Sequence, residues 1–291
     1  MKVLCILYDD PTGGMPSSYA IDELPKIDKY PDGTTVPNPK AIDFKPGELL
    51  GCVSGELGLR KFLEDAGHSL VVTSSKDGLG NVADKELIDA DIVISQPFFP
   101  YYLTREKMES AKNLKMAITA GIGSDHVDLQ AAMDHNVDVV EVTFCNSRSV
   151  AEHIVMMIIS MVRDYHTQHE IAKNGGWNIA DAVKKSYDVE GMHIGTVAAG
   201  RIGLDALRKM KPFDVHLHYF DRHRLPDSVE QELNLTFHES VESMIAVCDV
   251  VTINCPLHPE TEHLFDASMI SKMKKGAYIV NTARGKICDK D

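Results

Sequence analysis

The sequence predicts an α/β protein made of two domains, each built around a parallel β-sheet. Short runs rich in Val and Ile alternate with segments of helical periodicity along most of the chain, which is typical of such sheets. A chain of 291 residues is long enough for two domains that each bury a core. With 44% hydrophobic and 25% charged residues, its composition is that of a soluble globular protein.

The first domain is predicted over residues 1–146. Its expected strands and helices are short and alternate: strands at residues 2–8, 69–73, 91–95, 114–119 and 137–142, with helices such as 55–66 and 128–135. Residues 9–50 interrupt this alternation, since they are rich in Pro, Gly and Asp and follow neither period. A loop of this length in a compact domain is usually functional or wraps a neighbour, so we expect a long ordered extension.

The second domain is predicted over residues 147–291, where the pattern changes. Ser149 and Glu152 fit a capping box, in which each side chain bonds the backbone amide of the other. The apolar residues that follow at helical spacing predict a long helix connecting the domains. Further strands are expected at 192–197, 215–221, 250–254 and 277–281, and helices at 204–211 and 267–275, the last capped by Asp266.

Charge and composition exclude several classes of partner. The formal net charge of −13 argues against binding to nucleic acid or to an anionic membrane, and an anionic substrate would need a local cationic site. No apolar run approaches the roughly 18 residues that cross a bilayer. The apolar N-terminus stops at Asp9, which favours a strand over a signal peptide. The six cysteines form no C-x-x-C pair, so we expect reduced thiols and a cytoplasmic protein.

A glycine-containing turn follows the strand predicted at 192–197. The sequence Ala-Ala-Gly-Arg-Ile-Gly (198–203) leads from that strand into a helix, which is the context of a dinucleotide-binding Rossmann turn. Gly200 leaves room for a pyrophosphate at the helix N-terminus, and Gly203 lets the helix pack closely on the strand. Ala198 replaces the first glycine of the usual fingerprint, so the motif alone is weak.

Asp221 strengthens this interpretation, because it ends the next strand, 18 residues after Gly203. A carboxylate at that place can accept both ribose hydroxyls and repels a 2′-phosphate, which favours NAD over NADP. The nearby Arg222 and Arg224 could soften this preference. The alternative is a glycine turn that binds no ligand.

Two histidines on the same strand raise the question of a metal site. His216 and His218 lie two residues apart on one face of the strand and could ligate a metal in principle. No third ligand has suitable spacing. We therefore expect histidines that are satisfied within the strand, and no metal.

Several longer blocks carry a family resemblance. "PLHPET" and "NTARGK" resemble the D-2-hydroxyacid dehydrogenase superfamily, and "IDKYPDGTTVPNPKAIDFKPGELLG", "ISQPFFPYYLT", "TAGIGSDHVDL" and "NGGWNIAD" resemble its NAD-dependent formate dehydrogenases. With further blocks, the resemblance covers essentially the whole chain. It implies a flavodoxin-like substrate domain, a Rossmann domain that binds NAD, metal-independent hydride transfer from formate, and a homodimer.

The resemblance also implies a formate site. Arg284 is the natural clamp for a carboxylate, since its planar fork matches two oxygens. Asn146 would donate its side-chain amide and Ile122 its backbone amide, while Pro97 and Phe98 would form an apolar wall. In isolation, Arg284 at a strand end could be a surface ion-pair partner, but the surrounding "NTARG" block favours the substrate.

Contacts to NAD are implied for a larger set of second-domain residues. They are Ser147, Ala198, Gly200, Arg201, Ile202, Gly203, Asp221, Pro256, Leu257, His258, Pro259, Glu260 and Thr282. Relatives continue beyond Asp291 with further Rossmann strands, a Gln, a catalytic His and a helix that completes the first domain. Both domains are therefore expected to be incomplete at the C-terminus. Three explanations are possible: a truncated sequence, a partial chain or a real fragment. We favour a truncated sequence.

Two alternative functions remain open from the sequence. One is a D-2-hydroxyacid dehydrogenase of the glyoxylate or hydroxypyruvate reductase kind, which must also move a proton and pairs its catalytic His with an acid. The other is a non-catalytic NAD-binding protein on the same fold. The homodimer has independent but weak support, since the helix after Ser149 has more apolar residues than one buried face requires.

Overall fold

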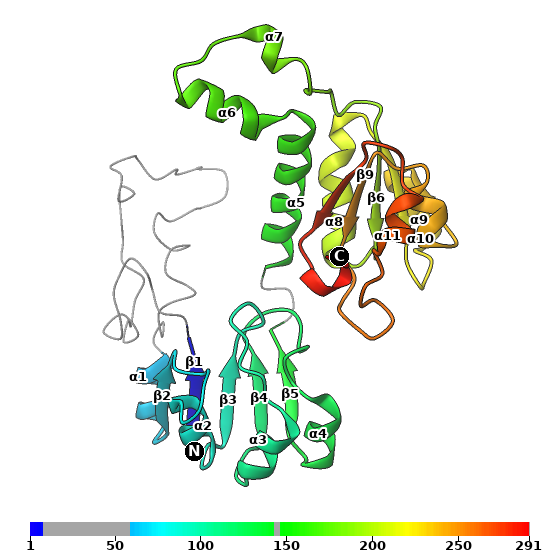
Figure 1. The fold of residues 1–291 in the computed structure, drawn as a ribbon. Coiled ribbons are helices and arrows are strands. Elements are labelled where there is room, and N and C mark those ends of the chain that lie inside the picture. Colours follow the sequence, from blue (N-terminus) through cyan, green and yellow to red (C-terminus); the bar gives the residue numbers. More distant parts are fainter. Residues whose placement is uncertain (8–58, 143–145, 291) are drawn as a thin grey trace. The chain divides into compact units, whose positions relative to one another are not determined.

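The computed structural model describes residues 1–7, 59–142 and 146–290. The chain separates into two compact units, Met1–Thr143 and Phe144–Asp291, and each is described by itself. Each unit has a five-stranded parallel sheet with helices packed on it (Figure 1). The predicted α/β class with two parallel sheets is therefore confirmed. The extension predicted at residues 9–50 lies outside the described residues.

Unit 1 has the strand order β2-β1-β3-β4-β5, which is the flavodoxin-like order. Its strands are β1 (Lys2–Ile6), β2 (Ser69–Thr73), β3 (Ile92–Ser95), β4 (Met116–Thr119) and β5 (Asp138–Glu141). Its helices are α1 (Leu59–Asp65), α2 (Val82–Leu87), α3 (Arg105–Ser110) and α4 (Leu129–Asp134). Leu4 and Ile6 on the central strand β1 are fully buried, as an apolar strand covered on both faces requires.

Unit 2 has the strand order β10-β9-β6-β7-β8. Its strands are β6 (His193–Val197), β7 (His216–Phe220), β8 (Leu235–Phe237), β9 (Val250–Ile253) and β10 (Tyr278–Asn281). Its helices are α5 (Ser147–Val162), α6 (Tyr165–Lys173), α7 (Ile179–Ala182), α8 (Arg201–Met210), α9 (Asp227–Leu233), α10 (Val241–Ile245) and α11 (Ala267–Ser271), with 3₁₀ helices η3 (Lys211–Phe213) and η4 (Gly285–Ile287). The order reverses at β6, where a Rossmann sheet binds its dinucleotide.

The predicted capping box at Ser149 is wrong. Helix α5 begins at Ser147, and Asn146 occupies the N-cap, so Ser149 lies inside the first turn. The buried face of α5 consists of Ala151, Ile154, Ile158 and Val162. This apolar pattern begins only at Ala151, so it does not determine where the helix starts.

Two helix boundaries in unit 2 differ from the predictions by three or more residues, and one strand was not predicted. Helix α8 starts at Arg201, three residues earlier than expected, because the extended Gly200 is its N-cap. Helix α11 is capped by Asp266, whose side chain accepts from the amide of Met269, as predicted, but it ends at Ser271 rather than at residue 275. The short edge strand β8 was not predicted.

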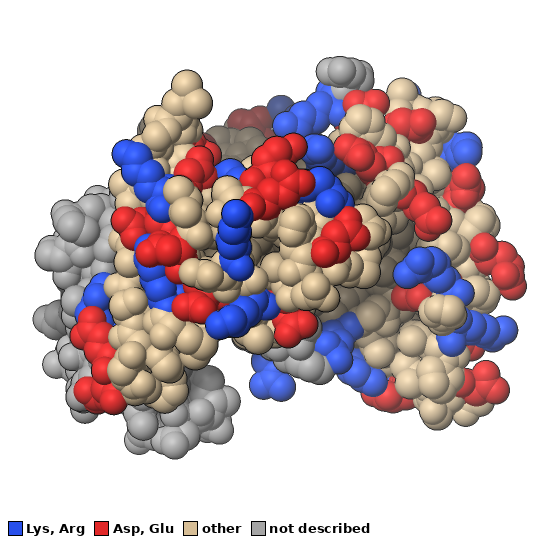
Figure 2. Space-filling model, turned by 90° about the horizontal axis from the view of Figure 1, so that it is seen from below, with Lys and Arg blue, Asp and Glu red and all other residues tan. Residues whose placement is uncertain are grey.

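The surface charge is mixed. Figure 2 shows acidic and basic side chains interspersed over the face in view, with apolar and neutral polar surface between them. Among the described residues, no helix is both long enough and apolar enough to cross a bilayer.

Candidate functional site

The turn between β6 and α8 has the geometry that a dinucleotide site requires. Ala198, at the place of the first fingerprint glycine, has a left-handed backbone with φ of 73°, which costs free energy for a residue with a side chain. Gly200 caps α8 in an extended conformation, and a Cβ built on it would meet no atom within 4 Å. Open space therefore lies beside the helix N-terminus, where backbone amides attract an anion.

Gly203 has the opposite environment. A Cβ at this position would lie 2.2 Å from the backbone oxygen of Ala198 and 2.6 Å from Oγ1 of Thr196. No side chain fits there unless the backbone moves. This confirms the predicted close packing of the helix on the strand.

Two residues that were not predicted as site residues, Thr196 and Asn254, support the glycine turn through hydrogen bonds. The hydroxyl of Thr196, fully buried on β6, donates to the backbone oxygen of Ala198 at 2.9 Å. The side-chain amide of Asn254 donates to Thr196 Oγ1 at 3.0 Å and to Thr252 Oγ1 at 3.1 Å. These bonds hold Ala198 in its left-handed conformation. Their residues come from different strands, so no local sequence signal marks them.

Asp221 is fixed at the carboxyl end of β7. Its Oδ2 accepts from the amide of Ala199 at 2.9 Å, and its Oδ1 accepts from the amide of His223 at 3.1 Å. The carboxylate is therefore tied directly to the glycine turn. The guanidinium of Arg224 is already paired, because it donates to both carboxylate oxygens of Glu230, at 2.9 and 2.8 Å. That pair leaves Arg224 unsuited to receive a 2′-phosphate.

Of the residues that the structure describes, three with a buried polar atom that has no protein partner belong to unit 2, where the sequence assigned them to the site, and three others belong to unit 1. Within the described part of the chain, Asn146 Oδ1, Ser147 Oγ and Thr282 Oγ1 are buried and make no hydrogen bond. Buried polar groups are nearly always bonded, so each such atom needs an explanation. Asn146 is the N-cap of α5 and yet its side chain does not cap the helix. A bound ligand would explain all three.

A pocket of about 580 Å³ lies against the start of α8. Ser147, from the first turn of α5, lines it together with Gly200 and Arg201. The structure thus brings Ser147 to the glycine turn, although 53 positions separate Ser147 from Gly200 in the sequence. Helix amides, an Arg side chain and a free hydroxyl suit a phosphate group.

Arg284 follows β10 in a turn shaped by Asn281. The side-chain amide of Asn281 donates to the backbone oxygen of Arg284 at 2.9 Å, and its Oδ1 accepts from the amide of Ala283 at 3.0 Å. The Arg284 side chain is half-buried, and its Nη1 donates to the backbone oxygen of Ala283 at 3.0 Å. Asn281 was not predicted to have this role.

The loop after β9 carries the other predicted NAD contacts: Pro256, Leu257, His258, Pro259 and Glu260. Thr261 folds this loop, since its hydroxyl donates to the backbone oxygen of Pro256 at 2.7 Å and accepts from the amide of His258 at 2.8 Å. Pro256, His258 and Glu260 are exposed at its tip.

The predicted wall residues lie in unit 1. Pro97 and Phe98 follow β3, and Ile122 follows β4, so all three leave the same carboxyl edge of the sheet. Phe98 is 49% exposed, so about half of its side chain lies on the surface of unit 1. No group of His, Cys, Asp and Glu in the described parts of either unit is arranged to hold a metal ion.

Comparison with known proteins decides the family. The NAD binding domain of the D-isomer specific 2-hydroxyacid dehydrogenases matches residues 155–291. Formate dehydrogenase from Pseudomonas sp. (strain 101) is 69% identical over 290 residues, which cover 100% of this chain and 72% of that enzyme. The chain belongs to the formate dehydrogenase family. Formate dehydrogenase from Neurospora crassa is 53% identical over 247 residues, and these make up 84% of this chain and 66% of the relative.

Solved structures of formate dehydrogenases agree. The Granulicella enzyme superposes with a TM-score of 0.86 at 64% identity, covering 100% of this chain and 77% of that one. The Staphylococcus aureus enzyme, solved in complex with NAD, has a TM-score of 0.79 at 36% identity, covering 100% of this chain and 76% of that one. D-lactate dehydrogenase from Aquifex aeolicus, at 24% identity and a TM-score of 0.70 over 79% of this chain and 67% of its own, shares the fold alone.

Proposed function

We propose that this protein oxidises formate to carbon dioxide and passes a hydride to NAD. The observation that carries the proposal is the 69% identity to a formate dehydrogenase over 290 residues. The hydroxyacid dehydrogenase alternative has weaker support, because D-lactate dehydrogenase from Aquifex aeolicus is only 24% identical. A non-catalytic NAD-binding protein would share the glycine turn but would have no reason to retain the predicted formate site.

The residues of unit 2 fit NAD. The amides at the start of α8 suit the pyrophosphate, because Gly200 leaves open space beside them. The fixed carboxylate of Asp221 suits the two ribose hydroxyls. Ser147 and Thr282 each offer a buried hydroxyl without a partner in the described residues. When bound, NAD supplies the acceptor for the hydride.

Formate oxidation suits the polar groups proposed to hold the substrate. The C–H hydrogen of formate leaves as a hydride and the product is neutral, so no general base is needed in the transfer itself. The protein must instead bind the carboxylate, align the C–H bond and exclude water. We assign the carboxylate to Arg284 and Asn146, with the Ile122 amide as a further donor and Pro97 and Phe98 as an apolar wall.

An absorbance assay of nicotinamide reduction tests this function. The protein that carries this chain is expected to reduce NAD with formate, to use NADP poorly, and to be inactive with glyoxylate or hydroxypyruvate plus NADH. Oxidation of NADH by an oxo acid without formate activity would support the hydroxyacid dehydrogenase alternative. NAD binding without either activity would support the binding protein.

We also propose a homodimer formed through an arm of unit 2, residues 165–187. The arm contains α6 and α7, neither of which has a buried residue, and Figure 1 shows both helices extending beyond the end of α5. It exposes Trp177 to 95%, Ile179 to 78% and Val183 to 61%. An apolar surface of this kind typically contacts another protein, and a second copy is the occupant we expect.

Light scattering after size exclusion tests the dimer. The unaltered protein is expected at twice its monomer mass, and Trp177→Ser with Ile179→Ser is expected to shift it to the monomer, because two exposed apolar anchors are lost. Met133→Ser on α4, which removes a side chain 65% exposed in unit 1, is the matched control and should leave the dimer intact. A monomeric unaltered protein would contradict the proposal.

A cytoplasmic location is proposed from the thiols. Among the described residues, Cys248, Cys255 and Cys288 form no disulfide, and Cys248 and Cys255 are buried. Burial raises the pKa of Cys255 to about 11, so its thiolate is disfavoured. Free thiols suit a reducing compartment, and cell fractionation tests the location.

A further inference from the structure

The segment of residues 96–103 in unit 1 is fixed by hydrogen bonds near both of its ends. It carries Pro97 and Phe98, the proposed apolar wall, between the end of β3 and the start of α3. Four polar side chains of this segment and of the residues around it are at most 4% exposed, namely Ser95, Gln96, Thr119 and His126 at 4%, 4%, 0% and 3%. Among the described residues, Gln96 Oε1, Thr119 Oγ1 and His126 Nδ1 make no hydrogen bond, whereas Ser95 Oγ and His126 Nε2 bond each other. Burying a polar group costs free energy unless the group is hydrogen-bonded, so the bonds that these residues do make show how the segment is fixed.

His126 ties the two ends of this segment together. Its Nε2 shares a 2.7 Å hydrogen bond with Oγ of Ser95, immediately before the segment. Its backbone oxygen accepts from the amide of Leu103, at the far end, at 2.9 Å. His126 itself belongs to the loop after β4 that carries Ile122, so one residue links the wall to the neighbouring loop.

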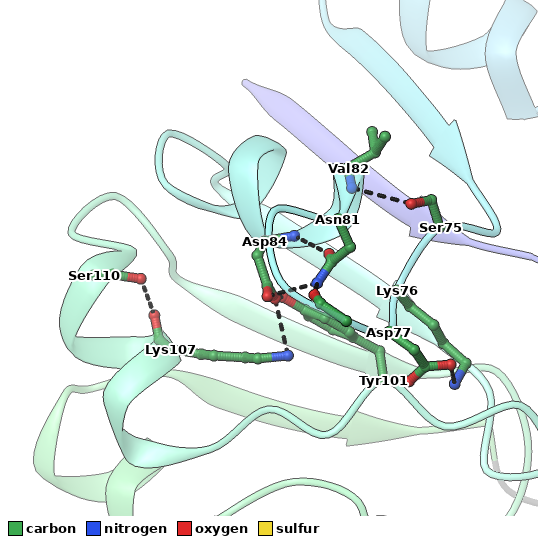
Figure 3. A network of polar contacts seen from close by, with 10 residues as sticks. Ser75, Lys76, Asp77, Asn81, Val82, Asp84, Tyr101, Lys107 and Ser110 are labelled. Carbon is green, nitrogen blue, oxygen red and sulfur yellow. Dashed lines mark hydrogen bonds and ion pairs between the residues drawn. The ribbon is translucent and has the colours of Figure 1, made fainter.

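A second anchor fixes the segment at Tyr101. Figure 3 shows the phenol of Tyr101 reaching Asp84 on α2, to which it donates at 2.6 Å. The same carboxylate accepts from Asn81 Nδ2 at 2.6 Å and pairs with Lys107 Nζ at 2.9 Å. Lys107 also lies 3.8 Å from the centre of the Tyr101 ring.

The ionisation of these groups agrees with a stable anchor. Burial opposes the charge of Asp84, but the hydrogen bonds from Tyr101, Lys107 and Asn81 outweigh it and hold its pKa below the ordinary value. Burial and the bond to Asp84 raise the pKa of Tyr101, so its phenol stays protonated and donates. The anchor is therefore intact throughout the neutral range.

Gly121 determines how closely the loop after β4 approaches Pro97 in the segment of residues 96–103. A Cβ on Gly121 would lie 2.8 Å from Cγ and 3.0 Å from Cδ of Pro97, and 3.7 Å from Cε1 of Phe98. Ordinary contacts begin at 3.4 Å, so a methyl group here would push Pro97 by about half an ångström. Anchored at Ser95 and Tyr101, the segment cannot shift as a whole, and the displacement must fall on Pro97 or on Ile122 beside Gly121.

We propose that Gly121 is a specificity-determining position, and that Ser95, His126 and Tyr101 are positioning residues that hold Pro97 and Phe98 at the spacing a small anion needs. The inference rests on the proposed formate oxidation, since it concerns the same substrate wall. Displacement of a reacting group by about 1 Å can cost on the order of 100-fold in rate. The small size of formate therefore explains why residue 121 has no side chain: a Cβ there would displace the wall that contacts the substrate.

The test is a double-mutant cycle on formate kinetics. Gly121→Ala is expected to raise KM for formate by about 10-fold while the Kd for NAD changes less than two-fold, since the NAD-binding groups belong to unit 2. Pro97→Ala removes Cγ and Cδ, the two atoms that the new methyl would strike. In the Pro97→Ala background, Gly121→Ala is therefore expected to change KM less than two-fold.

Two hydroxyl deletions test the anchors separately from packing. Ser95→Ala and Tyr101→Phe remove one oxygen each and are both expected to raise KM for formate at unchanged NAD affinity. Ser110→Ala is the matched control and should change neither, because it deletes an exposed hydroxyl whose one hydrogen bond among the described residues goes to the Lys107 backbone oxygen on α3. Two results would overturn the inference. One is an unchanged KM for formate in Gly121→Ala. The other is a Gly121→Ala effect on KM that is equally large whether residue 97 is Pro or Ala. An unaltered protein that fails to oxidise formate would instead refute the proposed function.

Discussion

Replacing Arg284 by Ala is expected to lower kcat/KM for formate by about 1000-fold, roughly 4 kcal/mol, with NAD affinity unchanged. The guanidinium is the only group proposed for the site that both carries a full positive charge and can bond two carboxylate oxygens at once. In a protein with a net charge of −13, its loss leaves formate without a cation to offset the surrounding negative potential. Steady-state kinetics with formate and calorimetric titration with NAD measure the two effects.

The fold around Arg284 is expected to survive the substitution. Asn281 bonds the backbone oxygen of residue 284 and the amide of Ala283, and neither bond needs the Arg side chain. Arg284→Lys keeps the charge without the planar fork and should retain an intermediate activity. Lys286→Ala is the matched control, since it removes an exposed cation two residues away whose partner is Glu262 at 3.5 Å. Normal formate turnover by Arg284→Ala would show that the carboxylate binds elsewhere.

The structural features that could be predicted from the sequence are those determined by residues close to one another along the chain. The alternation of apolar strands and helices gave both parallel sheets, because burial on two faces demands continuous apolar runs. The glycine turn was recognisable because Gly200 and Gly203 meet opposite demands within four residues, open space at the first and close packing at the second. The position of Asp221 followed in the same way from the end of a strand.

The features that were missed depend on contacts between distant segments. Asn254 reaches Thr196 across 58 positions to support the glycine turn, and an Asn at a strand end looks like any turn residue. Thr261 and Asn281 shape their loops through side-chain bonds to the backbone, which Thr and Asn make in most loops. The capping box failed because Ser149 and Glu152 match its spacing, but Asn146 occupies the N-cap and the helix begins at Ser147.

The histidines of β7 show the same limit. The sequence placed His216 and His218 on one face, and the structure adds His193 from β6 and His238 after β8. His218 shares hydrogen bonds with His193 at 2.8 Å and with His238 at 3.0 Å, and the rings of His193 and His216 stack at 4.5 Å. We predicted that these histidines form hydrogen bonds within the sheet. This is confirmed for His218, whose partners are the imidazoles of other histidines.

This histidine cluster makes unit 2 sensitive to acid. Burial, with the charges of the neighbouring histidines and of Lys274, lowers the pKa of His218 from 6.5 to about 4. Burial likewise lowers the pKa of His193, where His216 and Lys274 add to the effect and Asp249 opposes it, and the pKa of His238. The folded state therefore holds these rings neutral. In the unfolded chain they would take up protons below about pH 6.5.

The sign of the effect follows from this difference. Because the unfolded chain binds more protons between pH 6.5 and 4, the free energy of unfolding is at its full value above pH 6.5 and falls as the pH drops through that window. At 1.36 kcal/mol per pKa unit, the shift at His218 corresponds to a loss on the order of 3 kcal/mol, which it shares with the histidines coupled to it. Hydrogen exchange of the β6 and β7 amides, corrected for the intrinsic exchange rate, is expected to show this loss of protection.

Variants at His218 and at an exposed histidine separate this effect from general acid unfolding. His218→Gln should be less stable than the unaltered protein at pH 8, because a hydrogen bond to each neighbouring ring is disturbed, yet its protection should fall more gently from pH 6.5 to 4. His153→Gln, on the exposed side of α5, should keep the full slope. Equal slopes in all three proteins would mean that carboxylates elsewhere, and not the buried imidazoles, set the acid stability of unit 2.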